Sequence, residues 1–267
     1  MTTLDADTSA RVTLETASDI AILTLNSAAS RNALSLAMIE SLSARLDALA
    51  GGNEVRAVVL QAEGPAFCAG HDLKELTAHR NDPDSGRAFI EETMRACAAL
   101  MQKIVTLPRP VIAAVDEMAT AAGCQLVASC DLAVAGPRAR FCTPGVDIGL
   151  FCSTPSVALS RNVAQKQAME MLLTGVPIGA EEALRIGLVN RISADGARTG
   201  ALALAQLIAR KSPQAIRYGK KAFYAQRERP LVEAYEIASA VMVENMLAED
   251  AKEGIAAFLE KRAPTWS

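Results

Sequence analysis

The sequence predicts an α/β fold whose carboxyl-terminal part is entirely helical. Short apolar runs rich in β-branched residues alternate with stretches whose apolar residues recur every three or four positions, up to about residue 193. Beyond about residue 198 only the helical period remains. We therefore divide the chain into an α/β core over residues 1–197 and a helical region over residues 198–267.

The first predicted elements are a β-hairpin and an amphipathic helix. Residues 11–16 (RVTLET) and 20–26 (IAILTLN) are short apolar runs around the turn ASD, as expected of two paired strands. Segment 35–50 then changes period, with Ser35 as the N-cap and Gly51-Gly52 as the stop. Its apolar stripe consists of Leu36, Ile39, Leu42, Leu46 and Leu49.

The following segments repeat the order of strand and helix. Residues 55–61 read as a buried strand, FCAG at 67–70 as a strand-to-helix crossing, and 87–107 as a long helix. A strand at 111–115, a helix from about residue 121 and a strand at 131–135 follow, which predicts layered βα units with right-handed crossovers. The helices expected after the core are 199–210, 213–226, 230–247 and 251–262, and their apolar stripes predict packing on the core or on a neighbouring subunit.

Composition excludes several function classes. Hydrophobic residues make up 51% and charged residues 21% of the chain, the net charge is −3, and the cations are scattered, so no nucleic-acid partner is expected. No run approaches the roughly twenty apolar residues of a membrane span, and the acidic amino end does not resemble a targeting segment. We therefore expect a cytoplasmic protein with no membrane partner.

Cysteines and histidines point away from disulfides and metals. None of the six cysteines forms a CxxC pair and all lie among apolar or small residues, so we expect buried reduced thiols. The chain has only two histidines, which excludes a His-rich metal site, and no metal is expected.

Two short motifs suggest chemistry. In FCAGHDL (67–73) and TAAGCQL (120–126), small residues lead from a strand into a helix, whose first N–H groups are unpaired and carry the positive end of the helix dipole. Two such helix starts that converge would place two N–H donors around one oxygen, as an oxyanion hole requires. The alternative is that small residues only permit close packing at strand-helix crossings.

The segments AFCAGHDLKEL, PVIAAVDEMATAAGCQLVASCDLAVA and RFCTPGVDIGLF, in this order and spacing, resemble the crotonase, or enoyl-CoA hydratase/isomerase, superfamily. The resemblance runs from about Val12 to the carboxyl end. It implies a spiral of repeated ββα units with a C-terminal helical trimerisation region, assembled as a homo-oligomer, a trimer or a dimer of trimers. It also implies an acyl-CoA or enoyl-CoA as substrate or ligand and no tightly bound cofactor.

The resemblance assigns roles to particular residues. It places the oxyanion-hole donors at the N–H groups of His71 and Ala122, while the His71 imidazole could line the pocket or titrate near neutral pH. It matches the Ala69 carbonyl to the position that holds the adenine of coenzyme A, and residues 72–74 to the loop beside it. Lys74 could contact a phosphate or could be a solvated surface lysine, and Arg31 and Lys261 are weaker phosphate candidates. These coenzyme A candidates are Ala69, Gly70, Asp72, Leu73, Lys74, Arg31 and Lys261.

The sequence departs from the hydratase pattern at the two proton-transferring glutamates. Gln125 and Gly145 stand in their places, and neither an amide nor a glycine transfers protons at neutral pH. Ser153 falls where other members carry a third acid. Asp147, expected within an alternating strand, could be a replacement acid or could face solvent. Cys152 could attack a thioester only if its pKa were lowered.

Three functions remain open from the sequence. The first is an enzyme of fatty-acid metabolism that stabilises an enolate of an acyl- or enoyl-CoA, with ordinary hydratase activity not expected. The second is a non-catalytic acyl-CoA-binding or regulatory protein. The third is an acyl-CoA thioester hydrolase or decarboxylase.

Overall fold

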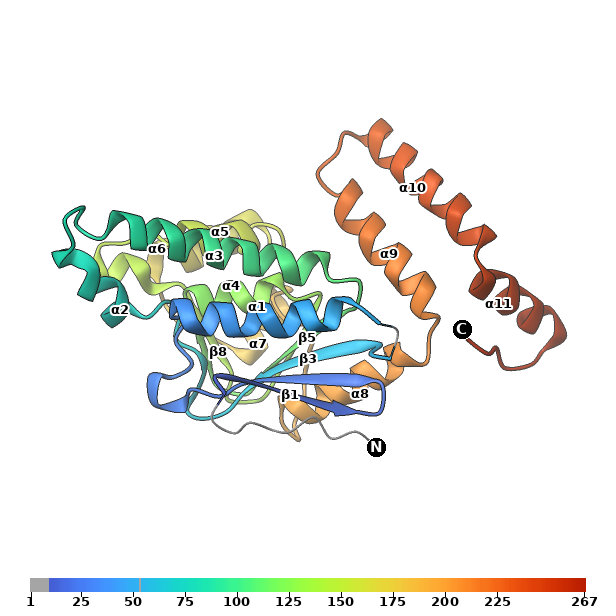
Figure 1. Cartoon of the computed structure of the whole chain (residues 1–267), viewed down its shortest axis with the longest axis horizontal. Helices are drawn as coiled ribbons and strands as arrows, with labels where there is room; N and C mark the ends of the chain where they lie inside the picture. The colour runs from blue at the N-terminus through green and yellow to red at the C-terminus, as the bar shows by residue number, and fades with distance from the viewer. Residues whose placement is uncertain (1–9, 53) are drawn as a thin grey trace.

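The computed structural model describes residues 10–52 and 54–267 and contains two β-sheets surrounded by helices (Figure 1). The larger sheet has the order β1-β2-β3-β5-β7-β10, and only its β1-β2 pair is antiparallel. Its strands are β1 (Val12–Ala17), β2 (Ile20–Leu25), β3 (Ala57–Ala62), β5 (Val111–Val115), β7 (Leu132–Ala135) and β10 (Arg191–Ile192). The smaller sheet consists of β4 (Ala66–Cys68), β6 (Met118–Thr120), β8 (Arg140–Cys142) and β9 (Ile178–Gly179), in that order.

The helices fall into a core group and a carboxyl-terminal group. The core group comprises α1 (Leu36–Ala50), α2 (Leu73–Ala78), α3 (Arg87–Thr106), α4 (Ala122–Ser129), α5 (Ser153–Leu159), α6 (Gln165–Thr174) and α7 (Ala180–Arg185). The carboxyl-terminal group comprises α8 (Ala197–Ala209), α9 (Pro213–Gln226), α10 (Leu231–Leu247) and α11 (Glu249–Glu260). Short 3₁₀ helices lie at η1 (Ala28–Ser30), η2 (His79–Asn81) and η3 (Pro144–Ile148).

The connectivity is a repeated ββα unit. In β3-β4-α2 and again in β5-β6-α4, a strand of the larger sheet is followed by a short strand of the smaller sheet and then by a helix. This arrangement confirms the predicted fold class. The sequence did not predict the short strands, because runs of two or three residues are too short to show an alternating pattern.

The predicted hairpin and first helix are confirmed with their local signals. Strands β1 and β2 pair from Val12 opposite Leu25 to Ala17 opposite Ile20. The Ser35 hydroxyl caps α1 by accepting a hydrogen bond from the Met38 N–H at 3.2 Å. At the other end of α1, the buried Arg109 guanidinium donates to the carbonyls of Ala50 and Gly51, which are among the orphan acceptors of a helix end.

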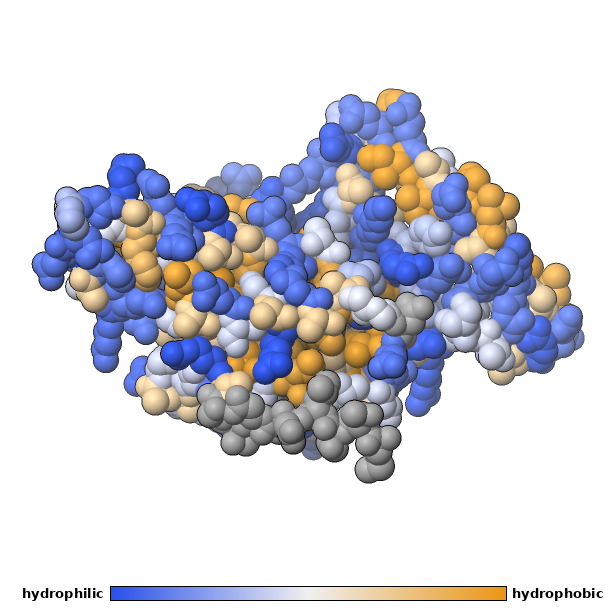
Figure 2. All heavy atoms as spheres, viewed as in Figure 1, coloured by the Kyte–Doolittle hydropathy of each residue, from blue (hydrophilic) through white to orange (hydrophobic). Residues whose placement is uncertain are grey.

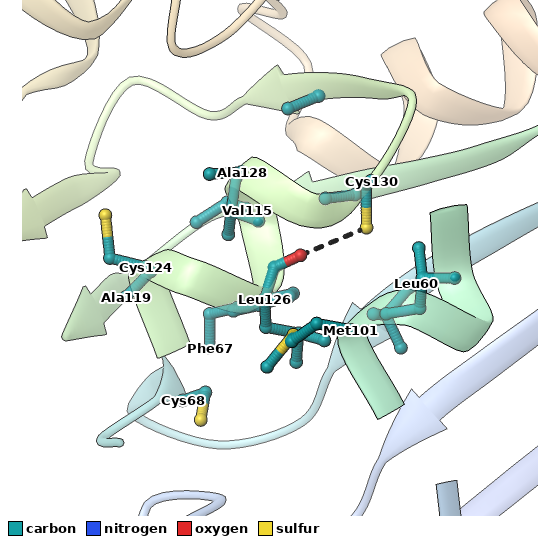
Figure 3. Close-up of a cluster of buried hydrophobic side chains, with 14 of the residues drawn as sticks. Leu60, Phe67, Cys68, Met101, Val115, Ala119, Cys124, Leu126, Ala128 and Cys130 are labelled. Carbon is teal, nitrogen blue, oxygen red and sulfur yellow. Dashed lines mark hydrogen bonds between the residues drawn. The ribbon is translucent and has the colours of Figure 1, made fainter. Parts of the chain in front are cut away.

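Both faces of the central strands β2, β3 and β5 are buried, which explains their nearly continuous apolar sequences. Val58 and Leu60 of β3 face the main core, which also holds α1, α3 and α4, whereas Ala57 and Val59 face α8. Figure 3 shows part of the main core, where the Cys130 thiol donates to the Leu126 carbonyl. All six cysteines are buried and unpaired, as predicted.

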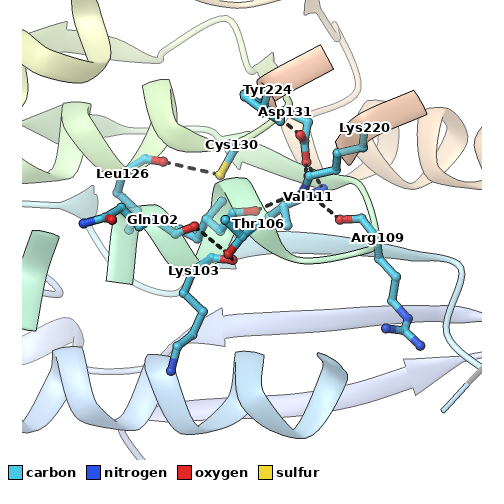
Figure 4. A network of polar contacts seen from close by, with 11 residues as sticks. Gln102, Lys103, Thr106, Arg109, Val111, Leu126, Cys130, Asp131, Lys220 and Tyr224 are labelled. Atoms are coloured by element: carbon cyan, nitrogen blue, oxygen red, sulfur yellow. Dashed lines mark hydrogen bonds and ion pairs between the residues drawn. The ribbon is translucent and has the colours of Figure 1, made fainter. Parts of the chain in front are cut away.

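Helix α8 packs on the sheet, whereas α9, α10 and α11 extend away from the core (Figure 1). A buried polar network fixes α9 to the core (Figure 4). The Lys220 ammonium donates to Asp131 at 2.6 Å and to the carbonyls of Ile104 and Arg109, and the Tyr224 hydroxyl donates to the other Asp131 oxygen at 3.0 Å. The two charged side chains are only 8% and 14% exposed, so each depends on the other for its pairing.

Within the described ranges, no helix has the length and apolar character needed to cross a membrane. The same residues contain no group of three or more metal-ligating side chains placed to hold an ion.

Candidate active site

The first candidate oxyanion donor lies where β4 passes into α2. His71 forms an isolated parallel bridge with Leu34, in which Leu34 N–H donates to the Gly70 carbonyl at 2.7 Å. In such a bridge the N–H of His71 points away from its partner strand. It donates to no other residue in the described part of the chain, so it is free to bind an external oxygen.

The second candidate donor is the first residue of α4. Ala122 N–H, at the helix start, likewise has no acceptor among the described residues, whereas the Ala121 N–H donates to the Cys142 carbonyl. Ala121 adopts φ 52° and ψ −115°, a conformation that disfavours a residue with a Cβ. Backbone strain of this kind, on the order of 1–3 kcal/mol, is concentrated at functional sites.

Two glycines bring the two donors together. Gly70 has φ +82°, and a Cβ added there would lie 3.0 Å from the Thr120 carbonyl oxygen and 3.3 Å from the Ala122 nitrogen. A Cβ on Gly123 would lie 2.2 Å from the Cys68 carbonyl oxygen. The two motifs therefore meet backbone to backbone, and the oxyanion hole itself stays a prediction. The same glycines also permit close packing of strand and helix, which was the alternative interpretation of the two motifs.

The His71 imidazole lies partly buried beside the first donor. Its Nδ1 is 3.4 Å from the Leu34 carbonyl oxygen, which can only accept, so Nδ1 carries the proton and Nε2 holds a lone pair. Nε2 is buried without a partner in the described structure. Burial lowers the pKa of His71 against the opposing effect of the Leu34 carbonyl, so the ring is neutral at pH 7.

Gln125 lies one helical turn after Ala122 on α4 and lines a cavity of about 540 Å³ between α3, α4, α5 and α9. Its side chain is only 4% exposed, and Oε1 has no hydrogen-bond partner in the described structure. The cavity wall is mainly apolar and includes Ala98, Met101, Val105, Ala128, Val157 and Ala158.

The structure also explains the glycine at position 145. A Cβ there would lie 2.7 Å from the Leu150 carbonyl oxygen and 2.9 Å from the Cys152 sulfur, so no side chain fits. Cys152 thus occupies the space next to the second glutamate position. Burial raises the pKa of its thiol, with a smaller opposing effect of the Gly145 N–H, so the condition for a nucleophilic Cys152 is not met.

Two other candidate residues lie on the surface. Asp147 was predicted in a strand but lies in the 3₁₀ helix η3, because Pro144 begins a helical turn and Gly149 ends it at φ +78°. Its side chain is exposed, in agreement with the solvent-facing alternative. Ser153, the first residue of α5, is also exposed, and the neighbouring Thr154 lines the cavity instead.

The coenzyme A candidates are only partly brought together. Arg31 contacts the first motif directly, since its carbonyl accepts from the Ala69 N–H at 3.0 Å. Lys74 is exposed and forms no ion pair in the described structure, and Leu73 is half exposed. Asp72 caps α2 by accepting from the N–H groups of Lys74 and Glu75.

Lys261 is remote from the other coenzyme A candidates within one chain. It is exposed at the end of α11, and Figure 1 places α11 and α2 at opposite ends of the molecule.

Sequence reasoning missed the cavity and the Lys220–Asp131 pair. The cavity is assembled from four helices far apart in the chain, and the ion pair joins residues 89 positions apart. The available signals were Asp131 directly before a buried strand and a lysine on the inner face of an amphipathic helix.

Comparisons with known proteins place the chain in a family. The model of the enoyl-CoA hydratase/isomerase family matches residues 15–267. The human enoyl-CoA hydratase domain-containing protein 3, mitochondrial, is 46% identical over 92% of this chain and 80% of that protein. Its crystal structure superposes with a TM-score of 0.91 over 96% of this chain and all of the other. An enoyl-CoA hydratase structure from Mycobacterium smegmatis is 47% identical, with the same TM-score over 96% and 98% of the two chains.

These relatives correct one prediction and confirm another. The expected cytoplasmic location is contradicted, because the domain-containing protein 3 relatives from frog, rat and human all carry the word mitochondrial in their names. The resemblance to this superfamily, read from the motifs, is confirmed. With its ββα core and a family match over nearly its whole length, this chain belongs to the enoyl-CoA hydratase/isomerase family.

Proposed function

We propose that this protein binds an acyl- or enoyl-CoA thioester and polarises its carbonyl between the N–H groups of His71 and Ala122. The observation that carries the proposal is that both N–H groups lack acceptors in the described structure and are brought together by Gly70. Hydrogen bonds from such donors stabilise the negative charge that develops on a thioester oxygen when an enolate forms. The metabolic setting that follows is fatty-acid or other acyl-CoA metabolism.

Ordinary hydration is not part of this proposal. Adding water to an enoyl thioester requires one group that removes a proton from water and one that delivers a proton to carbon. Gln125 cannot supply either, and Gly145 leaves no room for a side chain. Glu228 is the one carboxylate that lines the cavity in the described structure, and it is paired with Arg161 at 2.5 Å.

The same observation favours a second candidate function, a non-catalytic acyl-CoA-binding protein. A hole that binds the thioester carbonyl needs no carboxylate, whereas turnover needs a group that moves protons. The two candidates therefore share the binding step and differ only in the chemistry that follows.

We further propose that the chain forms a homo-oligomer, a trimer or a dimer of trimers. Large apolar side chains are exposed along α10 and α11, among them Leu231 at 73% and Phe258 at 80%, and Figure 2 shows hydrophobic residues gathered over α10. Apolar surface on this scale is typical of a protein–protein interface. Light scattering should give a mass three or six times that of the chain, and a monomer would contradict the proposal.

The binding proposal is tested by calorimetry with two ligands that differ at one carbon. Butyryl-CoA carries the thioester carbonyl, and S-butyl-CoA is the thioether with a CH₂ group in its place. We expect the thioester to bind about tenfold more tightly, the effect of two hydrogen bonds at about 0.7 kcal/mol each. Equal affinities would mean that the hole does not bind the carbonyl.

Turnover is measured on the same sample. Loss of the enoyl absorbance of crotonyl-CoA at a typical enzyme rate, about 1–10³ s⁻¹, would contradict the absence of hydratase chemistry. Release of free CoA or CO₂ from acyl-CoA esters would identify a hydrolase or a decarboxylase. Binding without any of these reactions would favour the non-catalytic candidate.

A further inference from the structure

A second cavity lies at the α8 face of the larger sheet. It has a volume of about 260 Å³ and is lined by residues at the carboxyl ends of β3 and β5 and by the first turn of α8. The alternation of β3 turns Gln61 to the same face as Val59, which packs against α8. The lining includes neither His71 nor Ala122 and shares no residue with the cavity beside Gln125, so this cavity is separate from the candidate active site.

One buried polar atom at this cavity lacks a hydrogen bond. Gln61 is only 6% exposed, and its Nε2 donates to the Thr24 hydroxyl on β2 at 2.9 Å, whereas its Oε1 has no partner among the described residues. Because Nε2 turns toward β2, Oε1 turns toward the neighbouring strand on the other side, β5, whose Ala114 lines the cavity. Buried polar atoms nearly always have partners, so an acceptor left unpaired at a cavity wall indicates that its partner is a ligand.

A carboxylate lies on the same side of the sheet. Asp116 directly follows β5, and one of its oxygens accepts from the Ala197 N–H at 2.8 Å, which joins it to the start of α8. Its second oxygen accepts no hydrogen bond from any residue of the described structure. Glu63, just after β3, also lines the cavity, and its exposed carboxylate has no ion-pair partner in the same part of the chain. Two acceptors, Gln61 Oε1 and the second Asp116 oxygen, are therefore available to one ligand group.

The two arginines of the lining are bound to other acids. The Arg138 Nε donates to Glu117 at 2.8 Å, and this pairing is the main reason that the pKa of Arg138 is raised, with a smaller contribution from the Asp116 charge. Arg198 lies 3.9 Å from Glu15, which is outside the cavity. The cavity therefore keeps an excess of negative charge, which attracts a cation and disfavours an anion.

We propose that this cavity binds a short primary alkylamine in its ammonium form. An ammonium group has N–H donors and no acceptor, which suits the acceptors of Gln61 and Asp116 and the negative charge beside them. The remaining wall suits an aliphatic chain, since it consists largely of the apolar residues Ala62, Ala66, Phe67 and Ala114. This site does not depend on the proposed acyl-CoA function, because the two share no residue.

The experiment compares three ligands with the full-length wild-type protein by calorimetry at pH 7.5. Butylamine is protonated at this pH, 1-butanol has the same chain without the charge, and ammonium chloride has the charge without the chain. We expect butylammonium to bind about tenfold more tightly than 1-butanol, the effect of a charge-assisted hydrogen bond. We also expect it to bind about tenfold or more tightly than the ammonium ion, because four CH₂ groups are buried with it.

Two variants and a matched control locate the binding. Asp116→Asn keeps an oxygen for the Ala197 N–H and removes the charge, and Gln61→Met keeps the length of the side chain and removes Oε1. Each should weaken butylammonium binding about tenfold. Asp195→Asn removes the same charge from an exposed residue two positions before α8 that does not line the cavity, and it should leave the affinity unchanged.

Three outcomes would overturn the proposal. Equal affinities of the wild type for butylammonium and 1-butanol would show that no charged group is recognised, and this result does not depend on any variant folding. Ammonium chloride binding as tightly as butylammonium would show that the apolar wall holds no chain. An equal loss in Asp195→Asn and Asp116→Asn would mean that the amine responds to the overall charge of the protein and not to this cavity.

Discussion

Replacing Gly123 by alanine should damage the candidate oxyanion hole and the fold together. The new Cβ would lie 2.2 Å from the Cys68 carbonyl oxygen and 2.8 Å from the Cys68 Cβ. Ordinary contacts begin near 3.4 Å, and the nearest atom is backbone, so the start of α4 has to move away from β4 by about 1 Å. We expect a loss of about 1–3 kcal/mol in the free energy of unfolding, as for other overpacked cores.

The effect on binding follows from the same displacement. A shift of about 1 Å in a positioning group can cost on the order of a hundredfold in function. Because Ala122 is the residue before Gly123, its N–H moves with the helix, and the advantage of butyryl-CoA over S-butyl-CoA should fall toward zero. Urea unfolding reports the stability, and calorimetry with the two ligands reports the hole.

The chain provides a matched control for this substitution. A Cβ added at Gly219, in the middle of α9, would meet no atom within 4 Å, so Gly219→Ala should raise the free energy of unfolding by about 0.5–1 kcal/mol through helix propensity alone. Gly123→Ala with unchanged stability and an unchanged preference for the thioester would refute the close approach of α4 and β4 and, with it, our account of the hole.

Three further predictions concern buried titratable groups. Lys220→Met should lower the free energy of unfolding by about 3–5 kcal/mol in urea titrations, because it leaves Asp131 buried without its cation. The double variant Lys220→Met/Asp131→Asn should lose less free energy of unfolding than Lys220→Met alone, because no buried charge is left unpaired. Since burial lowers the pKa of His71, the unfolded chain binds more protons than the native protein, so stability should fall as pH drops below about 6.5. His71→Gln should flatten that acid slope in thermal melts. Burial raises the pKa of Cys68 to about 12 and that of Cys97 to about 11, so both should react with a thiol reagent at pH 8 only after unfolding, and rapid labelling of the native protein would contradict their burial.

The sequence was informative wherever the signal was local. Ser35 before an apolar helical stripe predicted both the start of α1 and its capping bond, since the cap joins residues three apart. The glycine-containing crossings after β4 and β6 indicated two N–H groups without acceptors, because small residues and a helix start are adjacent in the chain. The pairing of these two crossings could be taken only from the family resemblance, since it depends on how β4 and β6 align in the smaller sheet.

Features built from distant segments were not predictable. The cavity beside Gln125 is closed by α9, whose position depends on a lysine and an aspartate far apart in the chain. Asp147 was misplaced because the apolar and polar residues of GVDIGL alternate like a strand, whereas a proline and a left-handed glycine set the backbone there. Local periodicity cannot outweigh such turn residues.

The two departures from the hydratase pattern are physically different. Gln125 lies within α4, is buried and has nearly the shape of a glutamate, so this departure concerns the chemistry of the side chain and not its size. At Gly145 no side chain fits, because the Leu150 carbonyl and the Cys152 sulfur fill the space that a side chain would need, and a backbone carbonyl cannot move aside as a flexible side chain can. The proposed donors at His71 and Ala122 are backbone groups, so neither departure removes them. In the proposed function, carbonyl binding depends on backbone N–H groups and proton transfer depends on side chains, so the first can operate without the second.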